Sequence, residues 1–238
     1  MFRRIVPLIS VLLVASAARA ADADLDEAAH KIVERTNRFR QDQKRDPLKT
    51  NEQLTATARD FAAWMAKNGK FAHDADGKQP WDRAKAHGYE YCEVAENTAY
   101  ASRETGFDTD QLVTDFIDGW EKSPGHRKNM LDPDLTEIGV GVARSAENGA
   151  YYGVQVFGRP RSLRIEFRVA NRAGTAVKYK VGDQNYELQP RMFTTHELCK
   201  PADMSLLAAD GSVVEKVRPA NGERFAVTDK QGLKLIKD

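Results

Sequence analysis

The chain has 238 residues, of which 36 are Lys or Arg and 35 are Asp or Glu, so its formal net charge is only +1. This balance supplies no bulk attraction to the phosphates of DNA or RNA, and we therefore expect no nucleic-acid partner. At roughly 100 to 200 residues per domain, the length allows one large core or two modest ones.

The first twenty residues have the order of segments found in a secretory signal peptide. Arg3 and Arg4 precede an apolar run at 5–17, and Ala18 and Ala20 supply the small residues of a cleavage site. The run is shorter than the roughly 20 apolar residues that a membrane-spanning helix needs, and no later segment approaches that length. We therefore predict an exported protein, periplasmic or extracellular, with no transmembrane anchor once the signal is removed.

Four helices are predicted from apolar residues that recur at helical spacing. The first follows a capping signal at Asp24, and the second begins after Asn51 and ends at Gly69. A short helix is expected at 80–87 and a fourth from Thr109 onward. Three tryptophans fall on apolar helix faces and are expected in the core: Trp64, Trp81 and Trp120.

Two short β-branched or aromatic runs at 137–143 and 150–158 are separated by the turn-forming sequence SAENG, which predicts a β-hairpin. Gly139 and Gly141 leave one face of the first strand as bare backbone, so another element is expected to approach it closely. Helices that flank a small antiparallel sheet predict an α/β sandwich.

After the boundary predicted at 159–162, the pattern changes to eight short β-type runs separated by turn sequences such as NRAG, VGDQ and ANGE. This regular spacing predicts a small all-β, sandwich-like domain at 162–238, after a first domain at 21–161. The second domain holds 13 basic and 10 acidic residues, whereas the first has an acidic excess. Charges of this size usually lie on solvated faces.

Cys92 and Cys199 are the two cysteines of the chain. In an oxidising compartment, a lone pair favours one disulfide over a metal site, which would need three or four clustered ligands. Two buried free thiols are the alternative, because the sequence does not show whether the Cα atoms lie within the roughly 7 Å that a bridge requires. His196 precedes Cys199 by three residues, but without further Cys or His nearby this spacing is weak evidence for a metal.

Several motifs stand together in the first domain: FAHD with His73, AEN with Glu96 and Asn97, SPGHRKN with Ser123 and His126 after a tryptophan, and TEIGVGV. In this order and spacing they resemble the CAP superfamily, that is, the cysteine-rich secretory and pathogenesis-related proteins with their SCP-like extracellular domain, and in particular its bacterial branch. The resemblance covers roughly residues 28 to 158. It implies an α+β fold in which a three-layer α-β-α sandwich carries a cleft lined by two histidines and acidic residues.

The resemblance also assigns roles to single residues. His73 matches the first cleft histidine, Glu96 the first glutamate and His126 the second histidine, whereas Ser123 stands where many members have a second glutamate. Two imidazoles and one carboxylate suit Zn²⁺ or a similar divalent cation with an open position for water, although the incomplete acidic set lowers the expected affinity and no cofactor is required. Alternatively, both histidines bond only to neighbours at helix edges. Asn97 is interpreted as ordering its loop through hydrogen bonds to the backbone.

Ser123 lies three residues before His126, and a serine beside an imidazole is the start of an acyl-transfer triad. However, Ser123 followed by Pro124 is also typical of a helix N-cap with proline at the first helical position, which would engage the hydroxyl with a backbone N–H. The chain contains no GxSxG sequence that would expose a nucleophile. We therefore interpret Ser123 as a cap.

Two functions from different classes follow. The first is a non-catalytic exported module that binds a ligand or partner in its His/Glu cleft; the resemblance implies a lipid, glycan or protein ligand. The alternative is a metal-assisted hydrolase or protease that uses His73, Glu96 and His126. The binding module is favoured over an enzyme because the motifs do not complete a set of nucleophile, base and orienting group.

Overall fold

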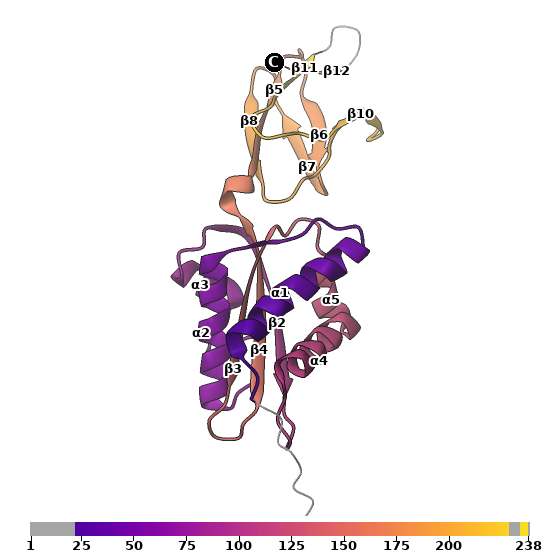
Figure 1. Cartoon of the computed structure of the whole chain (residues 1–238). Helices are drawn as coiled ribbons and strands as arrows, with labels where there is room; N and C mark the ends of the chain where they lie inside the picture. Colours follow the sequence, from indigo (N-terminus) through magenta and orange to yellow (C-terminus); the bar gives the residue numbers. More distant parts are fainter. Residues whose placement is uncertain (1–21, 229–233, 238) are drawn as a thin grey trace, which may run out of the picture.

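The computed structural model describes residues 22–228 and 234–237, so the predicted signal peptide lies outside the described residues. Its first part, residues 22–160, contains one four-stranded sheet with helices packed around it (Figure 1). The elements of this part are α1 (Leu25–Asp42), β1 (Lys49–Thr50), α2 (Glu52–Asn68), α3 (Pro80–Ala86), β2 (Tyr91–Ala101), α4 (Thr109–Lys122), α5 (Pro124–Leu131), β3 (Glu137–Arg144) and β4 (Tyr151–Pro160).

The sheet has the order β1-β3-β4-β2, with β1 parallel to β3 and the other pairs antiparallel. Side chains of α2 and α3 form one apolar core with the sheet, and side chains of α1, α4 and α5 form a second core with it. Helices therefore cover both faces, which confirms the predicted three-layer α-β-α sandwich. The β3–β4 hairpin was also predicted correctly.

The helix boundaries follow from local hydrogen bonds. Asp24 accepts a bond from the backbone N–H of Glu27, and Asn51 accepts one from Leu54, so each side chain satisfies a free donor at a helix start. Gly69 ends α2 with φ of 60°, a left-handed conformation that glycine adopts at little cost. These are the caps that the sequence predicted.

Gly139 and Gly141 let α2 lie directly on β3. A Cβ atom on Gly139 would be 2.1 Å from the backbone carbon of Leu54, and one on Gly141 would be 2.3 Å from the backbone nitrogen of Arg59. Because both neighbours are backbone atoms, neither could move aside as a flexible side chain would. The predicted close approach is confirmed, and α2 is the element that makes it.

Two features of this part differ from expectation. Trp120 is buried, but Trp81 is exposed, because the short helix α3 turns Pro80, Arg83 and Ala84 inward instead. In addition, β2 was not predicted as a strand. Three consecutive buried residues at its centre are polar, Glu96, Asn97 and Thr98, so β2 lacks the alternation of apolar and polar residues that marks a strand.

Residues 165–228 and 234–237 form two further four-stranded sheets that enclose an apolar core between them, as a β-sandwich does. His196 lies in this core, where its Nε2 is 2.9 Å from the hydroxyl of Tyr179. The strands are β5 (Ile165–Asn171), β6 (Val177–Val181), β7 (Gln184–Leu188), β8 (Phe193–Leu198), β9 (Met204–Leu207), β10 (Val213–Val217), β11 (Arg224–Thr228) and β12 (Lys234–Lys237).

The chain passes from the first part to the second through the short 3-10 turn Arg161–Leu163. A disulfide also joins the two parts: Cys92 and Cys199 are bonded, with Cα atoms 5.0 Å apart, as predicted. The next residue, Lys200, makes ion pairs with Glu93 at 2.7 Å and Asp132 at 3.4 Å. In the part of the chain that the structure describes, no helix is long and apolar enough to cross a bilayer.

Candidate functional site

The structure brings three of the predicted site residues together. His73 follows α2, Glu96 lies in β2, and His126 is in the first turn of α5. The Nδ1 atom of His73 is 2.9 Å from Oε1 of Glu96. The rings of His73 and His126 meet edge to face, with centroids 6.1 Å apart. The two imidazoles thus lie next to each other, and His73 is bonded to the buried carboxylate.

Arg83, which the sequence analysis did not identify, holds this carboxylate from the other side. Its Nη2 donates to Oε2 of Glu96 at 2.8 Å and to the backbone oxygen of His73 at 2.9 Å. Its Nη1 donates to Asp76 at 2.7 Å. The guanidinium is buried and lies 3.5 Å from the ring centre of Phe61. Pro80, Arg83 and Ala84 stand at positions i, i+3 and i+4 of α3 and therefore share its buried face. This helical spacing was the sequence signal for a buried arginine.

The two histidines differ in pKa for identifiable reasons. The hydrogen bond to Glu96 raises the pKa of His73 above its ordinary value of 6.5. Burial lowers the pKa of His126, and the positive charge of His73 lowers it further. The proton therefore resides preferentially on His73, whereas His126 stays neutral and offers a nitrogen lone pair to a ligand.

Asn97 joins β2 to α5 and holds His126 in place. Its side-chain amide donates to the backbone oxygen of His126 at 3.1 Å and to Gln155 at 3.0 Å. Its oxygen accepts a bond from Asn129 at 3.0 Å, and the same Asn129 group reaches the backbone oxygen of Glu96 at 3.1 Å. Asn97 is completely buried, so it positions the site.

Ser123 lies at the N-cap position of α5 before Pro124, but its side chain makes no capping hydrogen bond. The prediction that this hydroxyl caps α5 is therefore wrong. The reason is that Ser123 also ends α4, and its side chain lines a groove instead. Within the described residues, its hydroxyl makes no hydrogen bond to His126 either.

The groove has a volume of about 880 Å³ and begins at His126 and Ser123. Trp120, Phe71 and Tyr100 also line it, and the rings of Phe71 and Tyr100 are 6.0 Å apart. The side chains of Phe71 and Tyr100 are 50% and 47% exposed, so a large part of each aromatic surface stays open to solvent. Charged side chains also line the groove: Arg103, Asp115, Asp118 and Lys122.

The donor set decides how well the cleft fits a metal. Each oxygen of Glu96 accepts a hydrogen bond, and the Arg83 guanidinium beside it disfavours a second cation. No group of three or more His, Cys, Asp or Glu is placed to hold a metal among the described residues. The three-ligand set does not fit a metal in this arrangement. Two imidazoles remain, with Glu96 orienting His73, and Zn²⁺ binding to them stays a prediction.

Comparison with known proteins places this chain in one family. The family model described as CAP, the cysteine-rich secretory protein family, matches residues 33–157. This match covers more than half of the chain. The chain belongs to the CAP family, as its motifs predicted.

Individual relatives come from several bacteria. The protein YkwD of Bacillus subtilis (strain 168), itself described as uncharacterized, is 31% identical over 141 residues, which are 59% of this chain and 51% of that protein. The chain thus spans about half the length of this relative.

Solved structures with the same fold include an outer surface protein of Borrelia burgdorferi, with a TM-score of 0.51 and 18% identity over 59% of this chain and 98% of that one. At this identity the likeness shows the fold alone. An extracellular protein with an SCP domain from Bacillus anthracis str. Ames is 26% identical, with a TM-score of 0.47, over 57% of this chain and 41% of that one.

Proposed function

We propose that this chain is an exported, non-catalytic binding module, and that its ligand lies in the groove between His126 and the Phe71–Tyr100 pair. The observation that carries the proposal is that two half-exposed aromatic rings line the same groove as His126 of the histidine cleft. Ligand sites are concave surfaces with apolar walls and a few placed polar groups, and this groove has both.

The chemistry of the groove favours an amphiphilic, lipid-like ligand over a glycan or a protein segment. Phe71 and Tyr100 offer apolar area to an extended hydrocarbon body. In the same groove, the neutral imidazole of His126 and the hydroxyl of Ser123 offer hydrogen bonds to a polar head. Export is supported by the signal-type sequence at the start of the chain and by the disulfide, which persists in oxidising compartments.

The geometry gives the hydrolase alternative little support. Glu96 is poorly placed as a general base, because His73 and Arg83 hold both of its oxygens in hydrogen bonds. The neutral imidazole of His126 has a free nitrogen, but no nucleophile among the described residues is bonded to it. A nucleophilic serine needs an adjacent base, and Ser123 makes no hydrogen bond to His126 in the described part of the chain. Both features suit a preformed binding surface better than a reaction centre.

The test is a titration of the purified mature protein with cis-parinaric acid, a fatty acid that fluoresces when it enters an apolar site. Saturable binding is expected, and F71A/Y100A should weaken it at least about tenfold by removing two apolar contacts of roughly 1 kcal/mol each. W81A is the matched control, because Trp81 is an exposed aromatic residue outside the groove. Unchanged affinity in F71A/Y100A would show that the ligand does not bind in the groove.

A further inference from the structure

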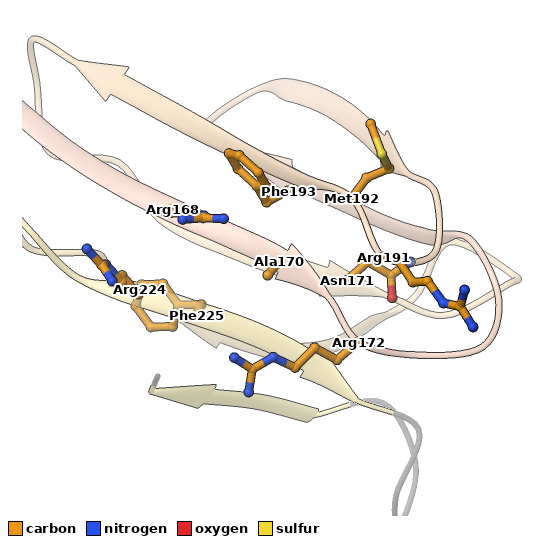
Figure 2. Close-up of a pocket in the computed structure, with 9 residues that line it drawn as sticks. All are labelled: Arg168, Ala170, Asn171, Arg172, Arg191, Met192, Phe193, Arg224 and Phe225. Carbon is orange, nitrogen blue, oxygen red and sulfur yellow. The ribbon is translucent and has the colours of Figure 1, made fainter.

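A cavity of about 460 Å³ lies on the β-sandwich, on the sheet of order β12-β11-β5-β8. Figure 2 shows four arginine side chains ranged around Ala170. No carboxylate is among the described residues that line it. The lining consists of Arg168, Ala170, Asn171, Arg172, Arg191, Met192, Phe193, Arg224 and Phe225.

Two of the arginines are neighbours by strand pairing. Arg168 of β5 and Arg224 of β11 are register partners in a parallel ladder, so their side chains lie on the same face of the sheet. Like charges placed opposite each other destabilise a sheet. In the described residues, neither guanidinium pairs with a carboxylate, and that of Arg168 lies 3.5 Å from the ring centre of Phe193. Among the residues that the structure describes, this positive pair therefore has no carboxylate partner.

Arg191 occupies a backbone position that favours glycine. The backbone N–H of Met192 bonds to the oxygen of Gln189 at 3.1 Å, and Pro190 and Arg191 are the central residues of this turn. Arg191 has φ of 64°, as the third residue of a type II turn requires, where Gly or Asn is preferred. An arginine at this position adds charge to the cavity despite the conformational cost.

Large apolar side chains stand beside these charges. Met192 and Phe193 are 56% and 55% exposed, directly after Arg191. Arginines beside exposed apolar side chains are the combination that binds at a membrane surface: the cations meet lipid phosphates and the apolar groups enter the interface. A pocket for a soluble anion would need the arginines alone and gives no reason to expose Met192 and Phe193.

We propose that this arginine face, defined by Arg168, Arg191, Arg224, Met192 and Phe193, docks on the anionic phospholipid headgroups of a membrane. Residues 162–238 carry 13 basic and 10 acidic residues, whereas residues 21–161 have an acidic excess, so an anionic surface attracts the β-sandwich rather than the CAP part. Figure 1 shows the β-sandwich at the opposite end of the molecule from most of the sheet β1–β4. The groove would then project away from the membrane.

Co-sedimentation of the mature protein with vesicles tests the proposal, by comparing mixed phosphatidylcholine and phosphatidylglycerol with phosphatidylcholine alone. Binding is expected only to the anionic vesicles and should weaken as salt rises. R168Q/R224Q should weaken it about 25-fold, at about fivefold per arginine. The matched control is R38Q/R45Q, which removes the same charge from exposed positions of the CAP part and should bind as the wild type does.

R191G separates binding from folding. Glycine suits the turn, so thermal stability should stay the same or rise, while vesicle affinity falls about fivefold. M192S/F193S should still bind anionic vesicles weakly and in a salt-sensitive way, because the arginines remain, but it should no longer insert side chains into the membrane interface. Equal binding to both vesicle types, or unchanged binding in R168Q/R224Q, would overturn the proposal. So would binding of inorganic phosphate or a phosphorylated polysaccharide in the absence of vesicle binding.

Discussion

Arginine has opposite roles in the two parts of this molecule. In the CAP part, Arg83 is buried and donates to Glu96 and Asp76, so its charge is fully matched. In the β-sandwich, Arg168 and Arg224 lie side by side on a surface without a carboxylate partner among the described residues. The partners, rather than the residue type, distinguish a charge that holds a site together from one that is available to a ligand.

The disulfide that connects the two parts should have the largest effect on stability. It closes a loop of 107 residues between Cys92 and Cys199. Loops of this length give about 4.7 kcal/mol in the chain-entropy model, less any strain. We expect the C92S/C199S double variant to lose up to this amount in chemical denaturation.

Independent folding of the two parts is a prediction that the same experiment examines. If each part has its own core, the variant should unfold in two transitions. Tryptophan fluorescence follows the CAP part, which holds all three tryptophans, and the NMR signals of Tyr179 follow the sandwich. Peptide mapping without reductant gives the control, because free thiols at both positions in exported wild-type protein would contradict the bridge.

Removing Arg83 should have the next largest effect. R83A leaves the buried carboxylate of Glu96 without its guanidinium, and the loss of one partner of a buried pair costs about 3 to 5 kcal/mol. R83A/E96Q should recover part of this loss, because no buried charge remains. In contrast, R168A/R224A should be neutral or slightly stabilising, since it relieves repulsion between like charges. The free energies of unfolding are measured by urea denaturation. Equal losses of stability in R83A and R168A/R224A would contradict the difference between the two parts.

The pH dependence of the site follows from two opposite shifts. His73 has a raised pKa, so its contribution to stability is present below pH 6.5 and is lost as pH rises through its folded pKa. His126 has a lowered pKa, so protonation opposes folding, and stability present above pH 6.5 is lost as pH falls through its folded pKa. Titration followed by NMR should show His73 protonated at a higher pH than His126. In E96Q, the His73 midpoint should fall toward that of His126; an unchanged midpoint would mean that Glu96 does not set it.

Zinc binding is the smallest expected effect. Two imidazoles fall short of the three protein ligands of a catalytic zinc site, so calorimetry should detect weak binding at most. H126A should bind more weakly than the wild type, and E96Q should also bind less, because Glu96 orients His73. H30A is a suitable control, since His30 is an exposed histidine of α1. Equal heats in H126A and the wild type would remove His126 from the metal site.

Much of the CAP part could be predicted from short stretches of sequence. The caps at Asp24 and Asn51 act on backbone groups three residues away, and the turn of the β3–β4 hairpin lies between adjacent runs. The motif order predicted that His73, Glu96 and His126 would meet. The strand β2 was not predicted. The polar residues at its centre are buried on both faces of the sheet, and this removes the alternation of apolar and polar residues on which strand prediction depends.

By itself, the sequence determined the caps at Asp24, Asn51 and Gly69, the hairpin, the close approach of another element to the β3 glycines and the family, because each depends on neighbouring residues or on a motif. Only the tertiary structure decided which charges have partners. Arg83 and Glu96 meet because α3 packs beside β2, and Arg168 and Arg224 meet because β5 pairs in parallel with β11. Electrostatic energy depends on distance and burial, and both quantities exist for these residues only once the chain has folded.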